Sequence, residues 1–457
     1  MRLAQILGPD LKATLADPEA LHRVINEAHP EDFAQYVEEL SDEDAVALMR
    51  ALPAGMAATV TERLSAEKQV VVLEGMRTEH AVSMLSEMAP DDRVDAVQAL
   101  PMARQSQIMQ LLEKQEPEAA EEVRELGAWG EKTAGGLMTT EFVGQPPETK
   151  VWQAIDEVRR LSHEGRAEIV HYIYVTAYGD KLVGVVSLRD LILADSAQEL
   201  QDIMTTEVVR VVPQEDQENV AETIAKYDLS AVPVVDINGS MLGVVTVDDV
   251  VDVLRQEATE DAQKMGAVLP LEDSYLQTGF FAFVRKRAAW LVVLFLGQLL
   301  SAEVLKEYEV ALRTTMGLVV FLPTIVGSGG NSGAQSATLI IRALSGGEIL
   351  PGDWWRVMLR ELAMGLVLGV FLGALGLARV WLQGGDDANI QLAIAVSLSV
   401  VAVVTVGTLV GSLLPLGMKR IGFDPALSST PFISSLVDVL GLLVYLGIAS
   451  VILQVAL

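Results

Sequence analysis

One carboxylate stands alone in an apolar part of the chain. Asp438 is the only charged residue of segment 425–457. An ionised carboxylate deep in a bilayer costs about 2.5 kcal/mol or more, so it needs a partner or a water-filled path. The apolar segments 314–341 and 390–418 contain no Lys, Arg or His. The pattern therefore favours a transported cation as the partner of Asp438. A proton-relay acid and an acid paired with Arg379 are the alternatives.

A second group of carboxylates precedes the apolar segments. Glu257, Glu260 and Asp261 are spaced i, i+3 and i+4, which places them on one face of a helix. They repel one another at neutral pH unless a cation binds between them, and oxygen ligands select hard cations such as Mg2+ or Ca2+. We expect a divalent cation to bridge this face to neighbouring acids; a solvated acidic linker is the alternative. The candidate partners are Asp91, Asp92, Asp95, Asp216, Glu218 and Asp228.

The acidity of the chain is confined to its first part. The 457 residues include 33 Lys and Arg and 62 Asp and Glu, for a formal net charge of -29. Residues 283–457 hold 11 and 10 of these, which leaves 22 and 52 for residues 1–282. Such acidity argues against a nucleic-acid partner. The absence of Cys excludes disulfides, thiolate metal sites and thiol catalysis.

Five apolar segments predict a membrane domain, because a spanning helix needs about 20 residues. Lys and Arg gather before the first segment, between the second and third, and between the fourth and fifth, so these connections are expected in the cytosol. The N-terminal part, which begins without a signal-peptide core, is then cytosolic, and the C-terminus lies outside. The predicted spans are 288–305, 314–341, 362–382, 390–418 and 425–457.

The second span has an unusual composition. Pro323 is followed by a run rich in Gly and Ser, PTIVGSGGNSGAQ. Such residues break a helix in lipid unless protein or water satisfies the freed backbone groups, so we expect a broken helix that lines a cavity. Close helix packing through small residues is the alternative.

The cytosolic part contains two kinds of repeat. Residues 45–49 recur 36 positions later as residues 81–85, which is typical of stacked helical hairpins. Further along, residues 137–140 (LMTT) and 184–190 are echoed by residues 203–206 (IMTT) and 243–249, within alternating strands and helices. We expect a helical superhelix followed by a tandem α/β unit.

The tandem resembles a pair of CBS domains. In many such pairs a Ser or Thr and an Asp three residues later hold an adenosine ribose. The resemblance therefore implies a nucleotide such as ATP at Ser187 and Asp190, and at Thr246 and Asp249. Capping of the following helix is the alternative. No Gly-Lys-Ser/Thr phosphate loop is present, so we do not expect ATP hydrolysis or any other enzyme activity.

One carboxylate is few for a bare divalent ion. If two copies of the chain meet on a twofold axis, two Asp438 side chains and the hydroxyls of Thr430 and Ser434 face one site. Two such carboxylates raise each other's pKa unless a cation lies between them. Mg2+ dehydrates reluctantly, so this sparse ring suits a hydrated Mg2+.

The whole order of segments resembles the MgtE family of magnesium channels, on the motifs PTIVGSGGNSGAQ and GFDPALSSTPFISSLVDVLG. The resemblance implies a homodimer in the cytoplasmic membrane with an axial pore, in which Asp438 selects the ion; Asn331 and Asp424, within the motifs, complete the pore set. It also implies regulatory Mg2+ that locks the connecting plug helices closed. The plug ligands implied are Asp249, Asp252, Glu257, Glu260 and Asp261.

We therefore expect a multidomain membrane protein with Mg2+ as both cargo and effector. The predicted domains are an all-α superhelical domain (1–130), an α/β tandem CBS pair (131–250), a connecting plug helix (251–282) and a five-helix transmembrane domain (283–457). A divalent cation:proton exchanger and a membrane-anchored nucleotide sensor are the competing hypotheses.

Overall fold

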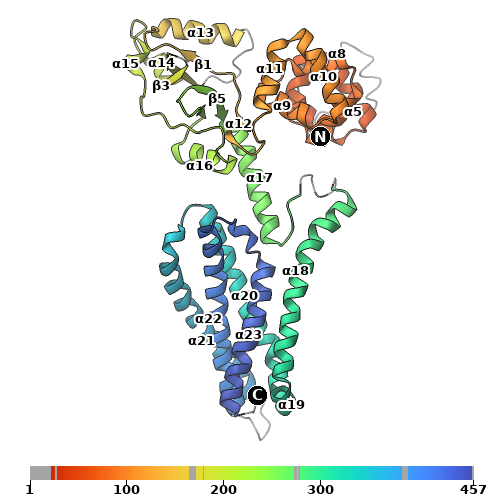
Figure 1. The fold of residues 1–457 in the computed structure, drawn as a ribbon, viewed down its shortest axis with the longest axis vertical. Coiled ribbons are helices and arrows are strands. Elements are labelled where there is room, and N and C mark those ends of the chain that lie inside the picture. Colours follow the sequence, from red (N-terminus) through yellow and green to blue (C-terminus); the bar gives the residue numbers. More distant parts are fainter. Residues whose placement is uncertain are drawn as a thin grey trace. The chain divides into compact units, whose positions relative to one another are not determined.

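The computed structural model of the chain forms two compact units, Met1–Arg255 and Gln256–Leu457 (Figure 1). The first 21 residues of the predicted superhelical domain lie outside the described residues. The predicted classes of structure are confirmed: helices, then an α/β tandem, then long apolar helices. The structure describes residues 22–25, 28–163, 171–178, 180–271, 275, 278–382 and 390–454.

The first part of the cytosolic unit is a stack of short helices whose apolar faces form one core. The repeated residues predicted from the sequence occupy equivalent positions in this stack: Ala45 and Met49 are buried in α5, and Ala81 and Leu85 are buried in α8. The helices are α4 (Pro30–Glu39), α5 (Asp42–Ala51), α6 (Ala54–Thr61), α7 (Ala66–Gly75), α8 (Thr78–Leu85), α9 (Pro90–Gln98), α10 (Met102–Gln115) and α11 (Pro117–Leu126).

Two small sheets follow. In the first, β1 (Val143–Gln145) is parallel to β2 (Tyr172–Ala177), and β2 is antiparallel to β3 (Lys181–Ser187). The second pairs β4 (Ala231–Val235) with β5 (Met241–Thr246) in an antiparallel hairpin. The helices of this part are α12 (Ala134–Leu137), α13 (Val151–His163), α14 (Leu188–Leu193), α15 (Leu200–Ile203), α16 (Gln217–Tyr227) and the start of α17 (Val247–Met265).

In the tandem, the repeated Met-containing motif of each half packs on a strand of the other half. Met204 of the second motif packs on Gly184 in β3, where a Cβ atom would lie 2.8 Å from the Met204 Cγ atom. In the other half, Met138 packs on Gly243 in β5, at 3.1 Å from the same kind of Cβ position. This reciprocal packing explains why Met and Gly recur together in both repeats, and it gives the pair its twofold character.

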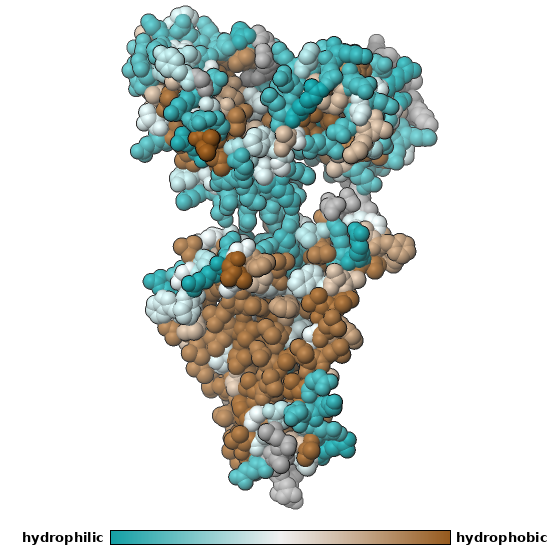
Figure 2. All heavy atoms as spheres, in the orientation of Figure 1, coloured by the Kyte–Doolittle hydropathy of each residue, from teal (hydrophilic) through white to brown (hydrophobic). Residues whose placement is uncertain are grey.

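Among its described residues, the helical unit contains five long helices, of which four are long and apolar enough to cross a membrane: α18, α21, α22 and α23. Figure 2 shows hydrophobic side chains over the outer face of this unit. The helix α20 is also long enough, but its Gly, Ser and Asn residues make it less apolar than the five-span prediction assumed. The bounds are α18 (Phe280–Glu307), α19 (Glu309–Thr314), α20 (Met316–Ser345), η1 (Pro351–Asp353), α21 (Trp354–Leu382), α22 (Ile390–Arg420), η2 (Pro425–Leu427) and α23 (Thr430–Leu453).

The prediction of a broken second span is wrong. The helix α20 is continuous through Pro323 and through the glycine run. Its glycines pack against another helix: a Cβ atom on Gly333 would lie 3.0 Å from the carbonyl oxygen of Gly407, and one on Gly411 would overlap the carbonyl oxygen of Gly333. Small residues thus bring α20 and α22 into backbone contact, as in other membrane helix pairs.

The connecting segment is also shorter as a helix than predicted. The helix α17 ends at Met265, and the described residues from Gly266 to Leu271 are not helical. Ala267 has a positive φ of 58°, which ends the helix in a left-handed turn.

Candidate functional site

Asp438 lies two turns into α23, where two other helices approach it. One carboxylate oxygen, Oδ2, is 3.5 Å from the side-chain amide nitrogen of Gln298 in α18. The other oxygen, Oδ1, is 3.3 Å from the place that a Cβ atom on Gly330 of α20 would occupy. The Ser434 hydroxyl is 2.7 Å from that same place. Asp438 makes no ion pair with Arg379 within the described chain, and Gln298 is a contact that the sequence prediction missed.

The other predicted pore residues are not gathered around Asp438. Thr430 is the first residue of α23, directly after its N-cap Ser429. Asn331 is exposed on α20, next to Gly330. Asp424 is the N-cap of η2, where its Oδ1 atom accepts a hydrogen bond of 2.8 Å from the Ala426 amide. Of the predicted set, the structure brings Ser434 close to Asp438.

Asp424 instead belongs to a cluster at the end of α17. The Lys264 ammonium lies 2.8 Å from Asp424 and 2.7 Å from Glu260. Burial alone lowers the pKa of Lys264, but its hydrogen bonds to these two carboxylates outweigh burial and raise the pKa. Asp261, one residue along, accepts a hydrogen bond of 3.2 Å from Ser345 at the end of α20. Two of the predicted plug acids therefore already have protein partners.

The cytosolic unit holds a tighter group of carboxylates, from Asp91 and Asp92 in α9 and Asp249 in α17. Burial, and then the charge of Asp249, raise the pKa of Asp91 well above its usual range. Burial, and then the charge of Asp91, do the same for Asp92. The Oδ1 atom of Asp91 is buried and accepts no hydrogen bond from the described chain. Crowded carboxylates with a buried, unpaired oxygen are features of a cation-binding site.

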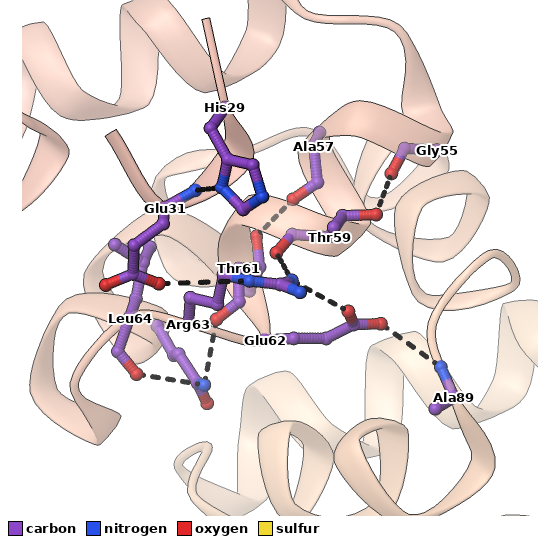
Figure 3. A network of polar contacts seen from close by, with 11 residues as sticks. His29, Glu31, Gly55, Ala57, Thr59, Thr61, Glu62, Arg63, Leu64 and Ala89 are labelled. Atoms are coloured by element: carbon purple, nitrogen blue, oxygen red, sulfur yellow. Dashed lines mark hydrogen bonds and ion pairs between the residues drawn. The ribbon is translucent and has the colours of Figure 1, made fainter. Parts of the chain in front are cut away.

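These carboxylates line a cavity of about 590 Å³. Its wall also contains Glu62, which is not among the residues predicted from the sequence. Figure 3 shows how Glu62 is held: its Oε1 atom accepts a hydrogen bond of 3.2 Å from the Ala89 amide, and Arg63 lies 3.6 Å from its other oxygen. Since Ala89 is the N-cap of α9, Glu62 fixes the start of the helix that carries Asp91 and Asp92.

Some of the remaining predicted regulatory residues lie near this group, and others serve the local fold. Asp95 lies one turn along α9, where burial, then the charges of Glu131 and Asp249, raise its pKa to about 6. Asp216 is the N-cap of α16 and bonds the Glu218 amide, while Asp228 ends that helix in a left-handed conformation. Asp252 lines the same cavity as Asp91, Asp92 and Asp249 and lies 3.8 Å from Arg255. Glu257 follows on the next turn of α17. Among the described residues, no three His, Asp or Glu side chains form a closed metal-binding cluster.

The predicted nucleotide residues pair with each other. The Ser187 hydroxyl donates to the Asp190 carboxylate at 2.6 Å and accepts from the Asp190 amide at 3.0 Å, as an N-cap of α14 does. Thr246 donates to Asp249 at the same distance of 2.6 Å. This geometry is that of the helix-capping alternative. Asp249 therefore accepts a hydrogen bond within the tandem and also belongs to the group of carboxylates with Asp91 and Asp92.

A second carboxylate within the membrane helices went unnoticed in the sequence. Glu361 of α21 is only 4% exposed and accepts a hydrogen bond of 2.7 Å from Ser336 of α20. It lies one residue before the predicted third span, so it was placed in a connection. The signal that could have found it is its position among small and apolar residues that continue the helical pattern.

A CBS pair and an acidic helical domain, joined to apolar helices that hold the carboxylates of Asp438 and Glu361, define a membrane transporter of cations with a cytosolic part. Family comparison agrees with this class. Residues 322–448 match MgtE, a divalent cation transporter; residues 28–132 match the MgtE intracellular N domain; and residues 134–197 and 200–256 match CBS domains. The chain belongs to the MgtE family, whose members are transporters and not enzymes.

Curated relatives support this assignment. The chain is 41% identical over 364 residues to the magnesium transporter MgtE of Thermus thermophilus, covering 80% of each chain. It is 35% identical over 337 residues to that of Enterococcus faecalis, covering 74% of this chain and 73% of that one. A crystal structure of the soluble part of a magnesium transporter matches 56% of this chain and 98% of its own, with 33% identity and a TM-score of 0.51.

Proposed function

We propose that the protein is a Mg2+-selective channel that mediates magnesium uptake across the cytoplasmic membrane. The observation that carries the proposal is the setting of Asp438, a carboxylate among membrane helices whose one side-chain partner in the described chain is the neutral amide of Gln298. A neutral partner leaves the negative charge uncompensated, so a cation is favoured beside it. The names of the relatives, magnesium transporters, supply the cargo.

The cytosolic carboxylates are the regulatory site of this proposal. Asp91 and Asp92 approach Asp249 in the first unit, with a buried oxygen of Asp91 unpaired. A Mg2+ ion among them supplies the missing positive charge, with waters completing its shell. The ion favours the arrangement in which the carboxylates are close, so it closes the channel only if it binds that arrangement more tightly than the open one. The acids of α17, Glu257, Glu260 and Asp261, extend the same regulation along the plug helix.

A homodimer completes the pore in this proposal, because one Asp438 per chain is few for a divalent ion. The excess of Lys and Arg in alternate connections supports a topology with the N-terminal domains in the cytosol and the C-terminus outside. ATP binding at Ser187, Asp190, Thr246 and Asp249 remains part of the proposal as a regulatory ligand, and would require those capping hydroxyls to exchange partners.

The test is Mg2+ flux into vesicles that contain the full chain. Asp438→Ala should abolish flux, and unchanged flux would remove the pore assignment. A flux that depends on an imposed pH gradient would favour the cation:proton exchanger. Flux that is absent altogether, together with ATP binding by calorimetry, would favour a membrane-anchored nucleotide sensor.

A further inference from the structure

The first membrane helix presents an unusual polar face. Gln298 and Ser301 of α18 are spaced i and i+3, so they lie on the same side of the helix. Ser301 is the one buried residue of α18, and its hydroxyl has no hydrogen-bond partner in the described chain. An amide and a hydroxyl are costly against lipid. This side of α18 therefore needs a polar environment.

That side of α18 faces α23. The Trp290 and Phe432 rings are 6.2 Å apart, and about two turns further along both helices Gln298 contacts Asp438. The two contacts show that α18 and α23 run side by side in the same direction. Ser301 lies one turn beyond Gln298 on the same side of α18.

The chemistry of the contact determines which way the amide points. An ionised carboxylate only accepts hydrogen bonds, so the Nε2 group of Gln298 must face Asp438. The distance of 3.5 Å makes this a weak, orienting contact. The Oε1 atom of Gln298 then points away from Asp438 and accepts no hydrogen bond from the described chain. It is an acceptor left for water.

Asp438 is also restricted on its other side. A side chain at Gly330 would meet the Ser434 hydroxyl at 2.7 Å and the Asp438 Oδ1 atom at 3.3 Å. One carboxylate oxygen is thus near α18 and the other is near α20. The orientation of the carboxylate depends on both neighbours, and Gln298 is the one that can hydrogen bond to it.

We propose that Gln298 is a specificity-determining residue of the ion path. Its Nε2 group orients the Asp438 carboxylate, and its Oε1 atom accepts hydrogen bonds from the water shell of a hydrated divalent cation. The inference rests on the proposed function, because it requires Asp438 to face the conducted ion. A hydrated Mg2+ is recognised through its waters, so the acceptors around it discriminate between cations whose water shells differ in size and stability.

The experiment compares Mg2+ influx into proteoliposomes for the full-length wild type and for Gln298→Leu, Gln298→Asn and Gln298→Glu, with Ca2+ or Mn2+ as competitors. Gln298→Leu should raise the Mg2+ concentration for half-maximal flux about threefold to tenfold, the range expected for the loss of one ordinary hydrogen bond. It should also reduce the preference for Mg2+ over Ca2+. Gln298→Asn should retain part of the wild-type affinity for Mg2+ and part of the preference for Mg2+ over Ca2+. Gln298→Glu, which adds a second charge, should lower the half-saturating concentration and slow the maximal rate.

The matched control is Leu300→Ala, on the same helix at a side chain that is 59% exposed. It should leave selectivity unchanged, and an equal loss in this variant would overturn the proposal in favour of general helix packing. If Gln298→Leu does not fold, Gln298→Glu is the variant that tests the proposal. A half-saturating Mg2+ concentration equal to that of the wild type in Gln298→Glu would also overturn it. Asp438→Ala separates the two claims. Retained flux in that variant removes the proposed function, whereas lost flux beside an unaltered Gln298→Leu removes only the role of Gln298.

Discussion

The hydroxyl of Ser336 donates a hydrogen bond of 2.7 Å to the carboxylate of Glu361, inside the helical unit. Glu361 makes no ion pair within the described chain, and its backbone oxygen accepts a further hydrogen bond of 3.2 Å from Thr408. Three helices, α20, α21 and α22, therefore meet at one glutamate. Since Gly330 of α20 also lies beside Asp438, Glu361 helps to fix the position of α20 next to that carboxylate.

Truncating Glu361 should destabilise the protein. Glu361→Ala leaves the Ser336 hydroxyl without its acceptor and opens a cavity, so we expect a loss of about 2 to 4 kcal/mol in unfolding free energy. Glu361→Gln keeps an acceptor of the same size and should lose less than half as much. Thermal unfolding in detergent measures both. Equal losses in the two variants would show that the hydrogen bond is not the stabilising element.

A side chain at Gly411 should separate α20 from α22. A Cβ atom there would overlap the carbonyl oxygen of Gly333, so Gly411→Ala forces the helices apart. We expect a loss of about 1 to 3 kcal/mol, typical of overpacking, and reduced Mg2+ flux. Gly417→Ala on the same helix is the control, because nothing lies within 4 Å of its Cβ position. This control should be neutral or slightly stabilising, and equal loss in both would point to helix flexibility instead of the contact.

The parts of the fold that the sequence predicted well are those with a local signal. The repeats of residues 45–49 and 81–85 are buried at equivalent places, because each helix needs the same apolar face. The glycine run of α20 misled the prediction, since its partners Gly407 and Gly411 are more than 70 residues away and small residues break a helix only when nothing packs on them.

The candidate site shows the same difference between residues with a local sequence signal and residues related only by packing. Asp438 stood out because it is a lone charge in an apolar segment. Gln298 did not, because a single amide in an apolar span gives no periodic or charge signal, and only the packing of α18 on α23 relates the two. Similarly, Lys264 and Asp424 are 160 residues apart in the chain, so their contact could not be read from spacing.

Neutralising Asp91 should have opposite effects with and without Mg2+. Without divalent cations, Asp91→Asn removes a crowded negative charge, so the melting temperature of the full chain should rise by about 2 to 4 °C, the equivalent of about 1 kcal/mol. Adding millimolar Mg2+ should raise the melting temperature of Asp91→Asn less than it raises that of the wild type, because the variant has lost a ligand. Asp156→Asn removes an exposed charge from α13 and serves as the control. An unchanged Mg2+ response in Asp91→Asn would exclude Asp91 as a ligand.

Removing the Lys264 ammonium should make the end of α17 dependent on divalent cations. Lys264 lies between Glu260 and Asp424, and its side chain is 19% exposed. Lys264→Met keeps most of the length and volume but leaves two partly buried carboxylates facing each other, with Asp261 nearby, so we expect a loss of about 1 to 3 kcal/mol in chelator-treated protein.

The same variant should respond more strongly to Mg2+ than the wild type, because the freed oxygens are suitable ligands for a hard cation. Thermal unfolding of the full chain in chelator and in a Mg2+ series measures both effects. Lys306→Met, at an exposed lysine of α18 that pairs only loosely with Glu303 at 3.8 Å, controls for loss of a positive charge. If Lys264→Met is as stable as this control in chelator, the Lys264 contacts do not hold the end of α17 in place. If it is less stable but Mg2+ gives it no extra stabilisation, the contacts are structural and the three carboxylates do not form a cation site when the lysine is removed.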